Sequence, residues 1–332
     1  MRNLVTGATG FIGSHIAQRL KARGEEVTAL VRKISNTDFL TGIGVKVAYG
    51  DVNNINSIRE AMSGIDIVYH SAALTDEWIS QKEAYRVNVE GTKNLLDCAL
   101  EAKVKRFVFI SSLAVLGRRD HYGTDADAPY CKAGDSYIDT KIDSEQLAVD
   151  YYKKYGLPVN IVRPGFVFGP RDYRLMPRIS GLIGKKRLVF IGDGKNKINL
   201  AYIDNVIDAI MLAAGCDKAI GRKYNVTNDS GMTLEDLISR ITDIWNLEKP
   251  TKRIPKSVAY MARGLLAGWA RLTNSKKPPY LTKTRIKFLS LNLDFDITKT
   301  RNDLGYVPRV SIEEGLKRTK EWMQEEGITV WT

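Results

Sequence analysis

The sequence predicts an α/β protein built around a doubly wound parallel sheet, with a smaller α+β part toward the C-terminus. Two observations support this prediction. Short apolar runs alternate with helical patterns through the first half of the chain, and a glycine-rich turn follows the first run. Such alternation is typical of a parallel sheet covered by helices on both faces. With 332 residues, 44% of them hydrophobic, the chain is long enough for one large domain and a smaller one.

The expected strands are apolar runs rich in β-branched residues, and helical patterns separate them. Six runs of this kind are Leu4 to Thr6, Val27 to Val31, Val45 to Tyr49, Ile65 to His70, Phe107 to Ile110 and Val159 to Val162. The helices expected between them are Ile12 to Arg23, Ile55 to Met62, Tyr85 to Ala102 and Tyr137 to Tyr155.

The pattern becomes less regular after Gly165, which suggests that the chain crosses between two domains more than once. Leu188 to Ile191 and Lys223 to Val226 are strand-like, and they flank the apolar segment from Leu200 to Ala214. We therefore expect a first domain of residues 1–170, to which residues 200–226 return. The second domain would consist of residues 171–199 and 227–330.

Composition narrows the class of protein. The three cysteines, Cys98, Cys131 and Cys216, are isolated, so neither a disulfide framework nor a cysteine metal site is expected, and a reducing compartment is indicated. The three histidines are scattered and are expected to be structural or exposed, so no metal site is predicted. The sequence shows no signal-peptide pattern and no run of 18 apolar residues, which predicts a cytoplasmic protein without a membrane-spanning helix.

The glycine-rich turn has the spacing of a phosphate-binding turn. Gly7, Gly10 and Gly13 stand three residues apart where the first strand passes into a helix. Glycine permits positive φ and close approach of the backbone to a pyrophosphate, which would lie at the positive end of the helix dipole. A tight turn alone would need similar glycines, but the flanking strand and helix favour a dinucleotide site of the Rossmann type. Other residues of the turn expected to contact the dinucleotide are Thr9, Phe11 and Ile12.

The choice between NAD and NADP is expected at the end of the second strand. Arg32 and Lys33 stand there, where a carboxylate would bind the ribose 2′-hydroxyl of NAD. Their positive charges suit a 2′-phosphate, so NADP is favoured over NAD, although both side chains could simply be solvated. Residues after the third and fourth strands that could meet the adenine, or let the cofactor pass, are Asp51, Val52, Ala72 and Ala73.

Three residues in the middle of the chain have the spacing of an acid-base site. Tyr137 and Lys141 lie four residues apart, which places a phenol and an ammonium on one face of a helix. A nearby cation favours the phenolate, so Tyr137 could act as a general acid-base near neutral pH. Ser112 lies 25 residues upstream, just after a predicted buried strand, where open α/β sheets bind ligands. The Tyr137 and Lys141 spacing alone would also fit a tyrosine packed on a lysine stem.

In order along the chain, these motifs resemble those of the extended short-chain dehydrogenases/reductases, and the likeness covers essentially the whole sequence. The resemblance implies an oxidoreductase in which Tyr137 transfers the proton, Lys141 activates it and binds the ribose, and Ser112 holds the substrate oxygen. A homodimer, formed through a helix pair that includes the helix of Tyr137, is also implied. Further residues that the resemblance places at the cofactor are Asn88, for which a structural role is equally open, Pro164 and Val167.

Two substrate classes are open within this family: nucleotide sugars, and hydrophobic alcohols such as 3β-hydroxysteroids. Phe166 stands where sugar-nucleotide epimerases and dehydratases commonly carry an asparagine, which removes a polar contact and adds apolar surface. Gly192 to Lys197 and Ala201 to Val206 resemble the branch of 3β-hydroxysteroid and sterol-4-carboxylate 3-dehydrogenases. Other candidates for the substrate cleft are Thr75 and three arginines, Arg171, Arg174 and Arg178. The arginines are suited to a carboxylate or phosphate, and the alternative is that they are surface charges.

The leading interpretation is an NADP-preferring dehydrogenase or reductase that acts on a secondary alcohol or ketone of a bulky apolar substrate. A carboxylate beside the reacting carbon would make the oxidised product a β-keto acid, which loses CO2 readily. A nucleotide-sugar 4-epimerase or dehydratase is one alternative, and a non-catalytic dinucleotide-binding sensor is another.

The formal net charge of +12 is concentrated in one segment. Residues 251–287 contain ten lysines and arginines and no acid. An apolar stripe at helical spacing runs from Val258 to Leu272, so a basic amphipathic helix at residues 256–272 could contact a membrane interface. The alternative is an ordinary amphipathic helix that covers the smaller domain or a dimer partner. Specific nucleic-acid binding is not expected, because no reader motif is present.

Overall fold

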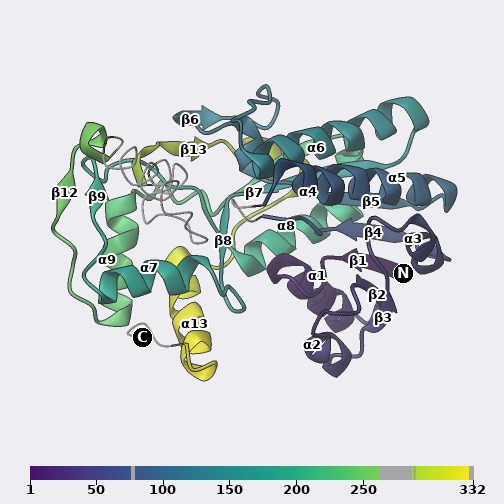
Figure 1. Cartoon of the computed structure of the whole chain (residues 1–332), viewed down its shortest axis with the longest axis horizontal. Coiled ribbons are helices and arrows are strands. Elements are labelled where there is room, and N and C mark those ends of the chain that lie inside the picture. The colour runs from purple at the N-terminus through teal and green to yellow at the C-terminus, as the bar shows by residue number, and fades with distance from the viewer. Residues whose placement is uncertain (76–78, 260, 262–285, 287–288, 329–332) are drawn as a thin grey trace.

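The centre of the protein is a sheet of seven parallel strands in the order β11-β7-β5-β4-β1-β2-β3 (Figure 1). The computed structural model describes residues 1–75, 79–259, 261, 286 and 289–328. The strand order reverses direction between β1 and β4, which is where doubly wound sheets bind their ligands. The seven strands are β1 (Arg2–Thr6), β2 (Glu26–Val31), β3 (Lys46–Tyr49), β4 (Ile67–His70), β5 (Arg106–Ile110), β7 (Val159–Pro164) and β11 (Lys223–Val226).

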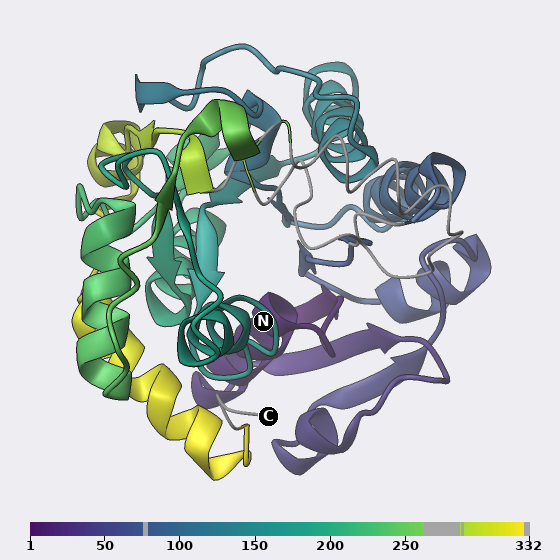
Figure 2. The same cartoon turned by 60° about the vertical axis from the view of Figure 1, so that its left-hand side comes forward.

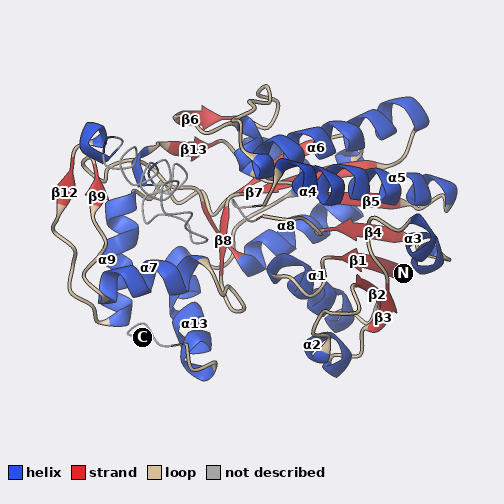
Figure 3. Ribbon diagram, viewed as in Figure 1, coloured by secondary structure: helices blue, strands red, loops and turns tan. Residues whose placement is uncertain are grey.

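Helices cover both faces of this sheet, as the alternating pattern predicts (Figure 3). Neighbouring residues of β1 point to opposite faces, so Val5 joins the core beneath α1 and α8, and Leu4 joins the core beneath α3, α5 and α6. The prediction of a doubly wound Rossmann sheet is therefore confirmed. The helices are α1 (Phe11–Ala22), α2 (Asp38–Gly42), α3 (Ile55–Met62), α4 (Gln81–Tyr85), α5 (Gly91–Glu101), α6 (Ser136–Tyr155) and α8 (Ile203–Gly215).

The helix expected from Tyr85 to Ala102 differs from the prediction. It begins four residues earlier, at Gln81, and a π-helical turn, η1 (Arg86–Glu90), interrupts it between α4 and α5. A π-turn inserts an extra residue into the helix, and such turns are frequent at functional sites. Apolar periodicity does not reveal it, because the turn is stabilised by polar contacts of Asn88.

Among the described residues, three pairs of short parallel strands lie outside the large sheet. The periodic pattern predicts only part of them. They contain two to four residues each, which is too short for a periodic signal. The pairs are β8 (Phe166–Phe168) with β10 (Leu200–Tyr202), β9 (Phe190–Ile191) with β12 (Arg253–Ile254), and β6 (His121–Thr124) with β13 (Leu293–Phe295).

The C-terminal helices share a core with the sheet. α9 (Leu234–Trp245) and α13 (Ile312–Glu325) lie side by side, in green and yellow in Figure 2, and α7 (Leu175–Gly184) and α12 (Thr298–Leu304) also belong to this part. One cluster of buried side chains runs from Val5 of β1 to Leu237 of α9 and Leu316 of α13. The domain boundary expected at residues 170 and 226 stays a prediction. Buried side chains from both expected domains pack in this one cluster.

Most of the basic segment lies outside the described residues, and so does most of the predicted membrane helix at 256–272, of which residues 256–259 and 261 are described. In the part of the chain that the structure describes, no helix is both long and apolar enough to cross a bilayer.

Candidate active site

The glycine-rich turn brings two loops into close backbone contact. Gly7 has φ +67°, and a Cβ on it would lie 2.7 Å from the backbone nitrogen of Ala72. A Cβ on Gly13 would lie 2.1 Å from the carbonyl oxygen of Gly7, so only glycine fits at either position. Gly10 precedes α1 and offers no side-chain cap, which leaves the first N–H groups of the helix available to an anion. This cradle fits a dinucleotide pyrophosphate. The other predicted contacts at this turn are Thr9, which is exposed, and the half-buried Phe11 and Ile12.

The predicted adenosine end has two exposed cations. Arg32 and Lys33 follow β2, and neither side chain forms a hydrogen bond or ion pair with another described residue. The half-buried Asp51 accepts two hydrogen bonds at 2.8 Å, from the backbone N–H and the side-chain amide of Asn53. Beside it, Val52 packs against Gly91 at the start of α5.

The loop after β4, which carries Ala72 and Ala73, is held by Asn88. The side-chain oxygen of Asn88 accepts from the N–H of Leu74 at 2.7 Å, and its amide nitrogen donates to the Leu74 carbonyl at 3.1 Å. The same nitrogen donates to the hydroxyl of Thr140 on α6 at 3.0 Å. Asn88 is buried, and these contacts connect the π-turn, the loop and α6. They indicate a positional task for this residue.

His70 ends β4 as a buried neutral imidazole. Its two ring nitrogens contact the hydroxyls of Thr6 at 2.7 Å and Thr92 at 2.8 Å. Burial, with a smaller contribution from the charge of Lys141, lowers the pKa of His70 to about 3.

We expect acid to destabilise the fold through His70, because the unfolded chain binds a proton that the native state excludes. The contribution of His70 to the free energy of unfolding is complete above pH 6.5, and it is lost as the pH falls toward 3. Between pH 7 and pH 5 the loss for one such histidine is about 2 kcal/mol. His15, whose pKa burial also lowers to about 3, adds a similar loss. Urea unfolding at pH 7 and pH 5 measures this loss of unfolding free energy. In His70→Gln the loss due to the two histidines should be about half as large. An unchanged pH dependence in that variant would contradict this account.

Ser112 and Tyr137 meet beyond the carboxyl end of β5. Ser112 begins a short 3-10 turn, η2 (Leu113–Leu116), where its hydroxyl oxygen accepts from the N–H of Ala114 at 3.2 Å. The Ser112 hydroxyl lies close enough to the phenol of Tyr137, in the first turn of α6, to lower the pKa of that phenol through hydrogen bonding. Both side chains are half-buried. The serine and tyrosine predicted from the sequence therefore lie together.

Lys141 lies one turn further along α6 and is buried. Its Nζ donates to the carbonyl oxygen of Ile110 at 2.7 Å and lies 4.6 Å from the centre of the Phe109 ring. α6 thus holds the end of β5 through a charged side chain.

The expectation that Lys141 lowers the pKa of Tyr137 is wrong for this structure. Burial raises the pKa of Tyr137, against the effect of the Ser112 hydrogen bond, and Asp135 raises it further. Burial lowers the pKa of Lys141 to about 8, with Glu145 opposing the change. Lys141 is not among the described groups that shift this pKa, and its ammonium donates to the Ile110 carbonyl instead. Tyr137 therefore carries its proton at neutral pH.

The sequence patterns do not predict the buried ion pair that lies near Tyr137 and Lys141. Glu145 and Arg163 are both fully buried, with the Arg163 Nη2 2.5 Å from Oε1 of Glu145. Charged residues are usually predicted at the surface. The available signal is position: Glu145 follows Lys141 by four residues and so continues the face of α6 that carries Tyr137.

The predicted substrate side is formed by the segment that leaves β7. Pro164 is buried at the end of β7, and Phe166 and Val167 are half-buried in β8. A Cβ on Gly165 would lie 2.1 Å from the carbonyl oxygen of Asn199, so glycine allows β8 to approach the segment before β10.

The three candidate arginines lie in different environments. Arg171 is directed at α1, where Nε donates to Ser14 at 3.1 Å and Nη2 donates to Gln18 at 2.8 Å. Arg174 donates from Nη1 to the hydroxyl of Thr75 at 2.8 Å, which joins two candidates for the substrate cleft. Arg178 is exposed on α7. Of the three, Arg174 is the one that contacts the loop after β4.

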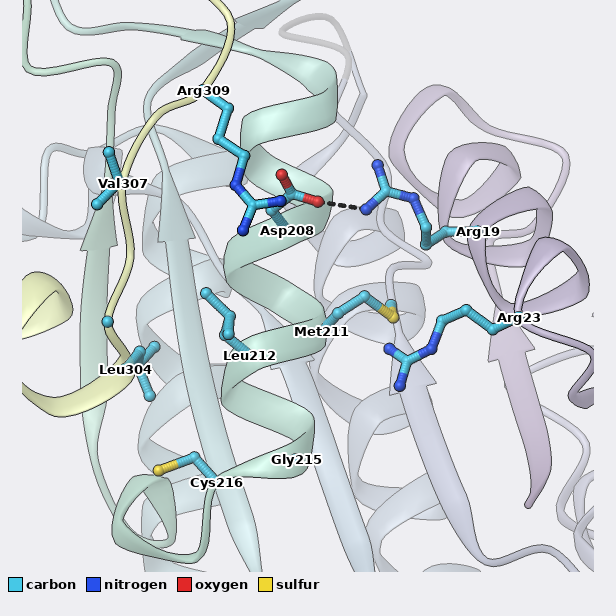
Figure 4. Close-up of a pocket in the computed structure, with 11 residues that line it drawn as sticks. Arg19, Arg23, Asp208, Met211, Leu212, Gly215, Cys216, Leu304, Val307 and Arg309 are labelled. Carbon is cyan, nitrogen blue, oxygen red and sulfur yellow. Dashed lines mark hydrogen bonds and ion pairs between the residues drawn. The ribbon is translucent and has the colours of Figure 1, made fainter.

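A hollow of about 700 Å³ lies at the other end of α1, between this helix, α8 and the segment after α12 (Figure 4). Its charges are largely paired: Arg19 forms an ion pair with Asp208, and Arg23 lies 3.2 Å from Glu25. None of the predicted site residues lines it. It is therefore separate from the site at the carboxyl edge of the sheet.

The fold and the site together define an oxidoreductase of the extended short-chain dehydrogenase/reductase type. The chain belongs to the NAD dependent epimerase/dehydratase family, whose family model matches residues 3–227. The family predicted from the sequence motifs is therefore confirmed.

Two relatives are named as a reductase and a dehydrogenase. The chain is 32% identical to the 2-alkyl-3-oxoalkanoate reductase of Shewanella oneidensis, over 95% of this chain and 84% of that protein. It is 30% identical to the decarboxylating sterol-4-alpha-carboxylate 3-dehydrogenase of Mus musculus, over 95% of this chain and 89% of that protein. Such relatives place the chain among dehydrogenases and reductases.

Solved structures match the whole chain. The crystal structure of gox2253 superposes with a TM-score of 0.83 at 27% identity, covering 99% of each chain. The dTDP-glucose 4,6-dehydratase DesIV from Streptomyces venezuelae, solved with NAD, gives a TM-score of 0.78 at 25% identity, covering 99% of this chain and 100% of that one.

Proposed function

We propose that the protein is an NADP-preferring oxidoreductase that interconverts a ketone and a secondary alcohol in a bulky apolar substrate. The observation that carries this proposal is the contact between Ser112 and Tyr137, above the buried Lys141 and at the sheet edge that bears the glycine cradle. A phenol, a hydroxyl and an ammonium at the switch point of such a sheet are the groups that carbonyl reduction requires.

We further propose that a carboxylate stands on the carbon next to the reacting one. A 2-alkyl-3-oxoalkanoate and a sterol-4-carboxylate share this arrangement. These two compounds appear in the names of the reductase and the dehydrogenase to which the chain is similar. Both also carry bulky apolar groups. Phe166, half-buried at the predicted cleft, supplies apolar surface for such a group.

Each site residue has a separate task in this reaction. Ser112 hydrogen-bonds the substrate oxygen, and Tyr137 holds the proton that passes to this oxygen in reduction. Lys141 keeps a positive charge beside that proton. The nicotinamide, when bound, supplies or accepts the hydride. Because the pKa of Tyr137 is raised, the residue carries its proton at neutral pH, and its role as a base in oxidation requires a more alkaline solution.

The preference for NADP is expected to depend on Arg32. Its exposed guanidinium has no partner among the described residues, so it is free to bind a 2′-phosphate. Arg32→Gln should weaken NADPH binding by about tenfold or more, since one charge-assisted hydrogen bond is lost. Fluorescence titration with NADPH and NADH measures both affinities. The NADH affinity is the internal control, and an equal loss for both would argue against a phosphate contact.

Arg174 is the expected partner of the substrate carboxylate. Arg174→Gln should raise KM for a 3-oxo acid by about tenfold and leave KM for its methyl ester unchanged. Arg178→Gln, an exposed arginine one turn further along the chain, is the matched control. Similar KM changes for acid and ester would assign the carboxylate to another residue.

The proposed function is tested by coenzyme turnover, followed through the ultraviolet absorbance of the reduced nicotinamide. The panel contains 2-alkyl-3-oxo acids with NADPH or NADH, and 3β-hydroxysterols with and without a 4-carboxylate with NADP or NAD. We expect turnover that requires Tyr137 and is faster with the phosphorylated coenzyme. Binding of the coenzyme without turnover of any member would contradict the proposal.

A further inference from the structure

α6 contacts the end of β5 through three consecutive turns. Tyr137, Lys141 and Glu145 are spaced by four residues and therefore lie on one face of the helix. Tyr137 lies within hydrogen-bonding reach of Ser112, and Lys141 donates to the carbonyl oxygen of Ile110 at 2.7 Å. The third contact is made by Glu145 and holds Ser111, which lies between Ile110 and Ser112 in the chain.

Ser111 is held by a carboxylate that is itself fixed. Its hydroxyl donates to Oε2 of Glu145 at 2.5 Å, and both residues are buried. Arg163 donates to Glu145 through Nε, at 3.0 Å and 3.1 Å from the two carboxylate oxygens, and through Nη2 at 2.5 Å. Tyr130 donates its phenol proton to Oε1 at 2.9 Å. The carboxylate therefore has several directional contacts and little freedom to turn.

The fixed carboxylate is anchored in elements on both sides of the site. Arg163 belongs to β7, the neighbour of β5 in the sheet, and its Nη1 donates to the carbonyl oxygen of Ala126 at 2.8 Å. Ser111 precedes Ser112 directly, so a small shift of Ser111 moves the hydroxyl that faces Tyr137. Displacements of about 1 Å are enough to slow an enzymatic reaction strongly.

We propose that Glu145 is a positioning residue, whose carboxylate, clamped by Arg163, holds Ser111 so that Ser112 stays in register with Tyr137. This inference rests on the proposed function, because it assigns Ser112 and Tyr137 to the reacting oxygen. Glu145 itself acts only through Ser111 and through its charge.

The charge of Glu145 has a second, measurable effect on Lys141. Its negative charge raises the pKa of Lys141 against the effect of burial. The other titratable or charged groups around this pair are Tyr137 on α6, His70 of β4, Arg163 of β7, Tyr130, and Lys223 of β11, whose Nζ lies 5.1 Å from the Tyr130 ring. Removal of the Glu145 charge should therefore make Lys141 lose its proton at a lower pH.

Two hydroxyl deletions test the positioning task. Ser111→Ala and Tyr130→Phe each remove one neutral donor to the same carboxylate, which keeps its pair with Arg163, but only Ser111 adjoins Ser112. We expect Ser111→Ala to lower kcat about tenfold with an unchanged KM for NADPH, and Ser111→Thr to restore most of it. Tyr130→Phe should stay within about twofold of the unmodified chain. Equal losses of kcat in Ser111→Ala and Tyr130→Phe would overturn the proposal, as would a full rate in Ser111→Ala.

A charge-free variant tests Glu145 without depending on turnover. Removal of Glu145 alone leaves Arg163 buried without its partner, which can unfold the chain, so the double variant Glu145→Gln/Arg163→Met is used. Lys141 is titrated by NMR with labelled lysine and is assigned through Lys141→Met. We expect Lys141 to titrate near its pKa of about 8 in the unmodified chain and at a lower pH in the double variant, because Glu145 shifts this pKa and Arg163 is not among the described groups that do. An unchanged Lys141 titration would overturn the action of Glu145 on the site. Absence of turnover in the unmodified chain would instead contradict the proposed function and leave this titration readable.

Discussion

Replacement of Tyr137 by phenylalanine is expected to lower kcat for ketone reduction by about a thousandfold while the affinity for NADPH stays the same. The phenylalanine keeps the ring that α6 places beside Ser112 and removes only the proton and its hydrogen bond. Steady-state kinetics give kcat, and fluorescence titration gives the coenzyme affinity. Since the pKa of Tyr137 is raised, we also expect the oxidative rate of the unmodified chain to increase with pH.

The matched control is Tyr155→Phe. Tyr155 ends the same helix, is 57% exposed and lies far along α6 from the site, so its hydroxyl should not affect the rate. A Tyr137→Phe variant that retains the full rate would remove Tyr137 from the reaction, and it would favour the interpretation as a dinucleotide-binding sensor.

The second large effect is expected from Gly13→Ala. An added Cβ would lie 2.1 Å from the carbonyl oxygen of Gly7 and 3.0 Å from Cα of Ala8, so the turn and α1 must separate. Overpacking of this kind costs about 1–3 kcal/mol of unfolding free energy, and it displaces the cradle from the pyrophosphate. We expect at least about a hundredfold loss of NADPH affinity, since a shift of about 1 Å disrupts such positioning. Isothermal titration and urea unfolding measure the two quantities.

Gly42→Ala provides the comparison for this steric effect. Gly42 is also helical, and an added Cβ there would meet no heavy atom within 4 Å. Alanine is favoured over glycine in helices, so this variant should be as stable as the unmodified chain or slightly more so. Normal NADPH binding in Gly13→Ala would show that the cradle tolerates displacement, and the pyrophosphate would have to bind elsewhere.

Regular elements were predictable because their periodic patterns are long. Seven strand-like runs correspond to the seven strands of the sheet, and the glycine turn lies where a strand-to-helix motif requires it. Ser112, Tyr137 and Lys141 were recognisable because spacing on a helix and a strand end determines which side chains share a face. These relations depend only on local backbone geometry.

The remaining features depend on contacts between distant segments. The bond from Arg174 to Thr75 joins residues 99 positions apart, and the pair of Glu145 and Arg163 joins α6 to β7. The raised pKa of Tyr137 results from burial, which a spacing of four residues does not reveal. The π-turn at Asn88 likewise depends on the position of the loop after β4.

The continuous core sets a limit on how substrate range can be altered. Leu237 of α9 and Leu316 of α13 belong to the same buried cluster as Val5 of β1. A chimera that takes its C-terminal helices from a relative would have to match side-chain shapes across the whole cluster, because protein interiors are close-packed. The two halves are therefore poor units of recombination, and substitution of single residues around Phe166 and Arg174, the proposed substrate contacts, is the more practicable route to new specificity.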